Sequence, residues 1–150
     1  MPIKKKSKRS GYNTNLASEF YALATLYRLG FDANLTLGNK KSVDIVVVRA
    51  PGDVATVDVK AVAGKMDWLV GNVVGPPRDN HFIVLLSYEG AFEDVSVVPS
   101  AWILPHAELL SRVGTPKTKS SLRFLSRKRV REECKAWKDA WHLIGDTAAA

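Results

Sequence analysis

The chain has 150 residues, a formal net charge of +7, and 46% hydrophobic and 25% charged residues, which are ordinary values for one globular domain with its own core. The longest apolar runs, 45–48 and 82–86, are too short to span a bilayer, and no apolar segment follows the basic N-terminus, so we expect no membrane association and no secretory signal. The single cysteine, Cys134, excludes an internal disulfide and fits a cytoplasmic location.

The first expected elements are a basic tail and a helix. Residues 1–12 are polar and basic, so we expect a flexible N-terminal tail. Thr14 or Asn15 can cap a helix that runs to about Leu29, and Gly30 is a suitable residue to end it.

Runs rich in β-branched and apolar residues follow this helix and predict strands. The strands are expected at residues 31–37, 42–48, 54–62, 81–87 and 95–98. Turn residues at 50–53 should join the second and third strands in a hairpin. A short helix is expected at about 105–113, and a final helix at about 127–143, where apolar residues recur at helical spacing.

This order of elements predicts an α/β (α+β) fold in which helices flank a central mixed β-sheet. Regular alternation of strand and helix is missing, so a doubly wound fold is not expected. A single domain should cover residues 13–145, and 146–150 should form a disordered C-terminal tail.

Glu19 is unusual because of its place on the first helix. Four apolar residues form a stripe along that helix: Leu16, Phe20, Leu23 and Tyr27. Glu19 projects inside this stripe or at its edge, whereas Ser18 lies on the opposite, polar face. A glutamate in such a position is rarely buried without compensation. It either reaches water or a lysine at the margin of the stripe, or belongs to a site.

Three charged residues stand out in the predicted hairpin. Asp44 interrupts an apolar run, while Asp58 and Lys60 are two residues apart and project from one face of their strand. If Pro51 is the centre of an odd-length turn, Asp44 lies across from Asp58, whereas a two-residue turn shifts this register by one. Facing carboxylates repel unless a divalent cation lies between them. The alternative is an edge hairpin with a solvated face, which explains Asp58 and Lys60 but not Asp44.

These residues resemble the pattern of the PD-(D/E)XK nuclease superfamily, and Glu19 resembles the helix glutamate of its Holliday-junction-resolvase-like members. The pattern reads Ser18-Glu19-Phe20, Val43-Asp44-Ile45 and Asp58-Val59-Lys60 in this sequence. Val43 replaces the proline of the motif, and Asp58 replaces the commoner glutamate. The resemblance implies a restriction-endonuclease-like fold and a nuclease domain.

The resemblance also implies roles for individual residues. Asp44, Asp58 and the carbonyl of Val59 would hold Mg²⁺, with Mn²⁺ as a substitute, and Glu19 would complete the shell. Lys60 would orient the attacking water and stabilise charge on the phosphate. The ion would polarise the phosphoryl oxygen and activate the water.

Two basic blocks, at residues 4–9 and 112–138, suit a polyanion such as nucleic acid. A solubilising tail and a solvated helix face are the alternative. The candidate nucleic-acid contacts are Lys40, Lys41, Lys65, Arg78, Arg127, Lys128 and Arg129. For Lys65 and Arg78, core packing or solvation is the alternative role.

The sequence therefore predicts a Mg²⁺-dependent endonuclease that hydrolyses phosphodiester bonds in DNA, as a homodimer if it cuts both strands, in the cytoplasm or at the nucleoid. The alternatives are a nucleic-acid-binding module on the same fold with little or no catalysis, and a purely structural or protein-interaction domain.

Overall fold

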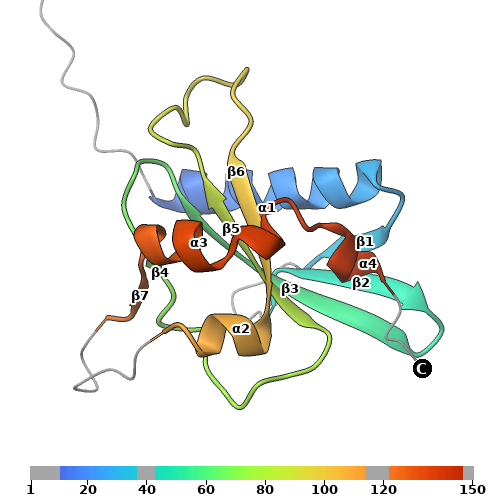
Figure 1. Cartoon of the computed structure of the whole chain (residues 1–150). Coiled ribbons are helices and arrows are strands. Elements are labelled where there is room, and N and C mark those ends of the chain that lie inside the picture. Colours follow the sequence, from blue (N-terminus) through green and yellow to red (C-terminus); the bar gives the residue numbers. More distant parts are fainter. Residues whose placement is uncertain (1–10, 37–42, 114–121, 147–150) are drawn as a thin grey trace, which may run out of the picture.

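A five-stranded mixed sheet forms the centre of the molecule (Figure 1). The computed structural model describes residues 11–36, 43–113 and 122–146. The sheet has the order β1-β2-β3-β5-β6 and is formed by β1 (Asp32–Leu35), β2 (Ile45–Ala50), β3 (Asp53–Val62), β5 (His81–Ser87) and β6 (Ser100–Pro105). Strands β3 and β5 run parallel, and the other neighbouring pairs are antiparallel. The predicted central mixed sheet is confirmed.

Helices cover both faces of this sheet. The helices are α1 (Gly11–Arg28), α2 (His106–Leu110), α3 (Arg127–Glu133), the 3₁₀ helix η1 (Lys135–Trp137) and α4 (His142–Gly145). One core packs α1 and α4 against the sheet, and includes Leu26 and Ile144. A second core packs α2, α3 and a two-stranded ribbon, β4 (Trp68–Leu69) with β7 (Phe124–Leu125), against the other face.

Helix α1 ends as the sequence predicts. Gly30 has a φ of 85°, and its N–H donates to the carbonyl of Tyr27 at 2.9 Å, while Phe31 N–H donates to Leu26 at 3.0 Å. This pair of bonds is the Schellman motif, which needs the left-handed conformation that glycine adopts without strain. The start of α1 differs from the prediction, because Gly11 and Tyr12 already belong to the helix and not to the tail. Residues 1–10 and 147–150, most of both predicted tails, lie outside the described residues.

The hairpin of β2 and β3 combines the two turn geometries that the sequence leaves open, a two-residue turn and the strand register of an odd-length turn. Its turn is the two-residue pair Pro51-Gly52, because Ala50 pairs with Asp53. A bulge between Val48 and Ala50 then shifts the pairing by one, so that the rest of the hairpin follows the register of an odd-length turn. Extended by one residue beyond Ile45–Val57, this register places Asp44 across from Asp58.

The predicted apolar stripe of α1 is wrong at two of its four residues, whereas Leu16 and Leu23 are half-buried. Phe20 and Tyr27 are 52% and 56% exposed, whereas Ser18, Ala22 and Leu26 are fully buried. Small side chains let the helix approach the sheet closely. Ser18 is also satisfied there, because its hydroxyl donates to the carbonyl of Thr14 at 2.6 Å and hydrogen-bonds Tyr88 at 3.0 Å.

The predicted strand at 95–98 is also wrong. Val95 and Val98 are 98% and 72% exposed, and this segment folds into turns, with Val97 N–H donating to the carbonyl of Asp94 at 3.0 Å. Its β-branched residues have the composition of a strand but not the pairing partner that a strand needs. The strand lies one segment later, at β6.

The predicted final helix at 127–143 is broken into three short pieces. Helix α3 stops at Cys134, and Asp139 has a φ of 54° that no α-helix permits. Between these points, Lys138 forms an antiparallel bridge with Trp102 on β6, and Asp139 N–H donates to the carbonyl of Ala101 at 3.0 Å. The chain leaves the helix because its backbone satisfies the outer edge of β6. Among the described residues, none of the helices is both long and apolar enough to cross a membrane.

Candidate active site

A cavity of about 900 Å³ lies beside the C-terminal half of β3, where this central strand has no neighbour on the side of β2. It forms there because β2 begins at Ile45, opposite Val57, so β3 extends past the end of its neighbour. The N-terminal half of α1 and the segments around β4 and β7 complete the walls. The polar lining residues are Thr14, Asn15, Glu19, Asp44, Lys60, Asp67 and Asn72.

Two carboxylates reach this cavity from different elements. Glu19 comes from α1 and is only 8% exposed. Asp44 comes from the residue before β2, where its backbone N–H donates to the carbonyl of Val57 at 2.9 Å. The carboxylate of Asp44 accepts a 2.7 Å hydrogen bond from the N–H of Val59. That bond fixes the carboxylate against the open edge of β3.

Val59 and Lys60 add a backbone group and a positive charge. Alternate residues of a strand direct their backbone groups to opposite neighbours, and Thr56 and Val62 bond towards β5. The backbone groups of Val59 therefore face the side of β2, where the cavity lies. Lys60 also lines the cavity. The residues that line the cavity thus include two acids, the backbone of Val59 and one lysine.

Asp58 is turned to another set of partners. Its carboxylate lies 3.4 Å from Nε2 of His81, whose Nδ1 is 2.7 Å from the hydroxyl of Thr56. The rings of His81 and His106 meet edge to face, 4.8 Å between centroids, and both are buried. Burial lowers the pKa of His106, and the nearby His81 and Arg78 lower it further. The Asp58 side chain is 15% exposed and lies outside the cavity lining.

The structure therefore brings together four of the residues expected from the sequence: Glu19, Asp44, Val59 and Lys60. Asp58 stays apart from them. Within residues 11–36, 43–113 and 122–146, no group of three or more His, Cys, Asp or Glu side chains is arranged to hold a metal ion. The ligand set implied by the resemblance remains a prediction.

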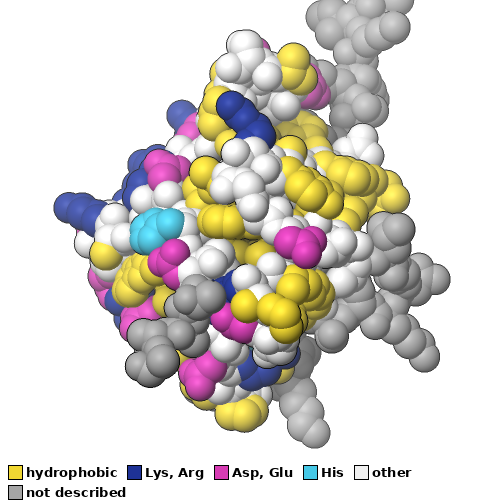
Figure 2. Space-filling view, turned by 90° about the vertical axis from the view of Figure 1, so that its right-hand side faces the viewer, with side chains coloured by type: hydrophobic (Ala, Val, Ile, Leu, Met, Phe, Trp, Pro, Cys, Tyr) yellow, Lys and Arg dark blue, Asp and Glu magenta, His cyan; other side chains and the backbone are white. Residues whose placement is uncertain are grey.

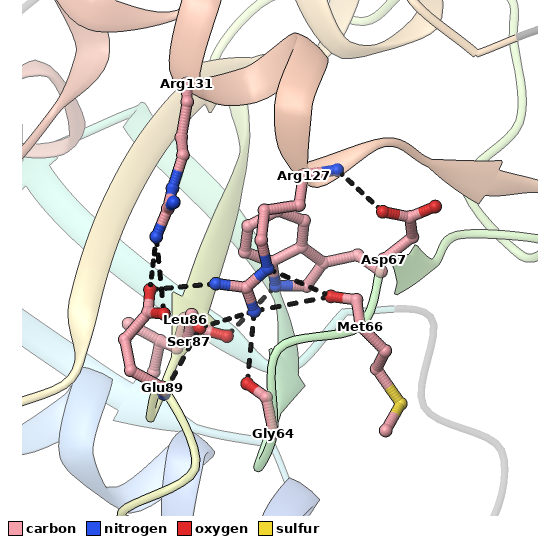
Figure 3. Close-up of polar contacts among 9 residues, drawn as sticks. Gly64, Met66, Asp67, Leu86, Ser87, Glu89, Arg127 and Arg131 are labelled. Atoms are coloured by element: carbon pink, nitrogen blue, oxygen red, sulfur yellow. Dashed lines mark hydrogen bonds and ion pairs between the residues drawn. The ribbon is translucent and has the colours of Figure 1, made fainter.

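Arg127 fixes one wall of the cavity from behind (Figure 3). Its guanidinium donates to Glu89 at 2.8 Å, to the hydroxyl of Ser87 at 2.7 Å and to the carbonyl of Gly64 at 3.1 Å. It also donates to the carbonyl of Met66, and its backbone N–H donates to Asp67 at 2.8 Å. Gly64, Met66 and Asp67 all line the cavity, so this arginine shapes the site.

The position of Arg127 corrects its predicted role as a nucleic-acid contact. The residue is 8% exposed, and its guanidinium is already bonded inside the protein. Glu89, its acidic partner, also faces Arg131 at 3.3 Å. Burial alone would raise the pKa of Glu89, but Arg127, Ser87 and Arg131 together hold the pKa below its ordinary value. Arg127 is a structural residue that the charge pattern of the sequence could not separate from its neighbours.

The other predicted contacts are surface residues where the structure describes them. Lys65, Arg78, Lys128 and Arg129 are exposed, and Lys40 and Lys41 lie outside the described residues. Arg129 pairs with Glu133 at 2.8 Å. On the face drawn in Figure 2, most of the basic side chains lie toward the left and hydrophobic side chains gather toward the upper right. That face is therefore not uniformly basic.

The β4–β7 ribbon is the part of the site that the sequence did not indicate. Each strand has two residues, too few for a periodic signal. Trp68 and Leu125 are fully buried, while their neighbours Leu69 and Phe124 face outward into the cavity. Nothing in the sequence indicated that Asp67 belongs to the site, since its partner Arg127 is 60 positions away along the chain.

The fold is similar to that of a solved nuclease. The bacterial homing endonuclease I-Ssp6803I superposes with a TM-score of 0.57, covering 92% of this chain and 93% of that one at 18% sequence identity. At this identity the likeness establishes the fold alone: the chain shares the mixed α/β fold of that protein. No protein-family model and no curated protein matches the sequence.

Proposed function

We propose that the chain is a divalent-metal-dependent endonuclease of the PD-(D/E)XK type, acting on phosphodiester bonds in DNA. The observation that carries the proposal is the convergence of Glu19, Asp44 and Lys60 on one cavity from separate elements. The fold of a homing endonuclease and the net charge of +7 support the same substrate class. A fold alone would not support it, because one fold hosts many activities.

The donor set in the cavity fits a hard cation such as Mg²⁺. Mg²⁺ prefers oxygen ligands and is usually held by one or two carboxylates together with waters. Asp44 and the carbonyl of Val59 would hold the ion, and Glu19 would bind it directly or through a water. When bound, the ion would polarise the phosphate and activate a water for attack.

The remaining residues of the set would act on the phosphate and on the geometry. Lys60 supplies positive charge where negative charge grows on the phosphate during hydrolysis. The Val59 N–H holds the Asp44 carboxylate in one orientation before substrate arrives. Asp58 would join the ion only after its side chain turns away from His81, because the two now lie 3.4 Å apart.

The position of Asp58 favours one alternative, a nucleic-acid-binding module with little or no catalysis. An aspartate is shorter by one methylene than the commoner glutamate, and here its carboxylate faces His81. Such a module would bind DNA in a salt-dependent manner without cutting it.

Cleavage of plasmid, junction and single-stranded DNA in Mg²⁺ or Mn²⁺ distinguishes the two functions. Asp44→Asn and Lys60→Ala should each lower the rate by at least about 100-fold, the scale of losing one charge-stabilising group. Asp32→Asn, an exposed aspartate on β1 outside the cavity, is the matched control and should cut at the normal rate. Cleavage that persists in Asp44→Asn, or wild-type protein that binds every DNA and cuts none, would contradict the proposal.

A further inference from the structure

One wall of the cavity is apolar, and metal-dependent hydrolysis does not require such a wall. Four exposed apolar side chains line it: Met66, Leu69, Leu122 and Phe124. Their exposed fractions are 65%, 50%, 67% and 51%. Isolated exposed apolar residues need no explanation, but a group of them beside a charged site marks a binding surface.

Two of these residues form a paired face. Leu69 and Phe124 are direct partners across the β4–β7 ribbon, so their side chains lie next to each other on the same side. Their neighbours Trp68 and Leu125 point the opposite way and are fully buried. The ribbon therefore divides into an anchoring face and a presented face.

The presented face is held rigidly. On the anchoring side, Trp68 donates its indole N–H to the carbonyl of Leu86 at 3.0 Å and packs edge to face on Trp102. The guanidinium of Arg127 lies 5.4 Å from the Trp68 ring. A further backbone bond, from Val70 N–H to the carbonyl of Arg123 at 3.0 Å, extends the ribbon. An aromatic group on such a support binds without losing much conformational freedom.

We propose that Phe124, flanked by Leu69, is a stacking platform for an unpaired nucleobase adjacent to the phosphate that reaches Lys60. The inference rests on the proposed function and adds its substrate class. Every nucleobase has a π-face that stacks on an aromatic side chain. That face is covered inside a paired duplex, so the site favours DNA in which a base near the cut is unpaired. The phosphate and the base of one nucleotide would then occupy the two chemically different walls of one cavity.

The test compares binding to a paired duplex and to the same duplex with a short unpaired bubble carrying 2-aminopurine, in EDTA so that no cutting occurs. Wild-type protein should prefer the bubble and change the 2-aminopurine fluorescence. Phe124→Ala should weaken binding to the bubble by roughly 5- to 100-fold, the range for one base–aromatic stack. Phe124→Tyr should retain the preference. Phe20→Ala, an equally exposed aromatic on α1 outside the cavity lining, should bind as wild type.

Equal binding of the bubble by wild type and Phe124→Ala, or no preference by wild type, would overturn the platform while leaving Mg²⁺-dependent cleavage intact. If wild-type protein prefers the bubble but does not cut DNA in Mg²⁺, the proposed hydrolysis is overturned and the platform is not. Sedimentation velocity gives a third readout. If Phe124→Ala converts an oligomer to a monomer and weakens both DNAs equally, the face joins two copies of the chain and the platform is refuted.

Discussion

Replacing Arg127 with alanine should strongly destabilise the protein, although the residue stands in a basic segment whose neighbours are exposed. The guanidinium is bonded to Glu89, to the Ser87 hydroxyl and to the Gly64 carbonyl. Its removal leaves these groups without their donor. Breaking a buried ion pair by removing one partner costs about 3–5 kcal/mol.

The lower end of that range is expected here. The Glu89 side chain is 30% exposed and keeps Arg131 at 3.3 Å, so it is neither fully desolvated nor alone after the change. We therefore expect a loss of about 3 kcal/mol, a large part of the roughly 5–15 kcal/mol by which a domain is stable. Arg127→Lys should lose less, because it keeps the charge but not the planar fork.

Urea unfolding of each variant measures this loss. With an m-value of about 2 kcal/mol/M, 3 kcal/mol moves the midpoint down by about 1.5 M. Lys128→Ala is the matched control, because its side chain is 81% exposed and its change should stay within about 0.5 kcal/mol. A loss of stability below about 1 kcal/mol in Arg127→Ala would refute the structural role of Arg127. The role of nucleic-acid contact, which the sequence suggests, would then be favoured.

Three further expectations concern Glu89, Cys134 and Gly145. Glu89→Gln should be less stable than wild type at neutral pH and equally stable in acid. The folded protein lowers the pKa of the Glu89 carboxylate, so this group stabilises the fold above its ordinary pKa and stops doing so as the pH falls through the lowered pKa. Urea unfolding at neutral and acidic pH tests this. Cys134 is fully buried, and burial also raises the pKa of its thiol, so a thiol reagent should label it only when the protein unfolds; fast labelling of the native protein would contradict this burial. Gly145→Ala should cost about 1–3 kcal/mol by thermal unfolding, because a Cβ there would lie 2.3 Å from the Phe31 ring, whereas Gly71→Ala, with open space, should be neutral.

The strands of the sheet were predictable where the sequence alternates or runs apolar between turn residues. The hairpin of β2 and β3 and the central strand β5 fall close to their expected positions. The bulge near Arg49 was not predictable, because pairing and not composition creates it. Similarly, the segment after Cys134 leaves its helix to satisfy the edge of β6, a demand made by residues far away in the chain.

The candidate site was partly predictable for a different reason. Glu19 and Asp44 were conspicuous because a charge among apolar residues needs an explanation, and the structure places both at the cavity. The orientation of Asp58 was not predictable, since its partner His81 comes from a neighbouring strand. The position of Phe124 was not predictable either, because a two-residue strand after a basic segment has no periodic pattern.

Crystals of the whole protein soaked in Mn²⁺ test the central claim most directly, because the anomalous signal locates the ion independently of activity. We expect a peak in the cavity beside β3, in contact with the Asp44 carboxylate and the Val59 carbonyl, and its loss in Asp44→Asn. A peak at Asp58 and His81 alone, or no peak in the cavity at saturating Mn²⁺, would contradict the proposed metal site.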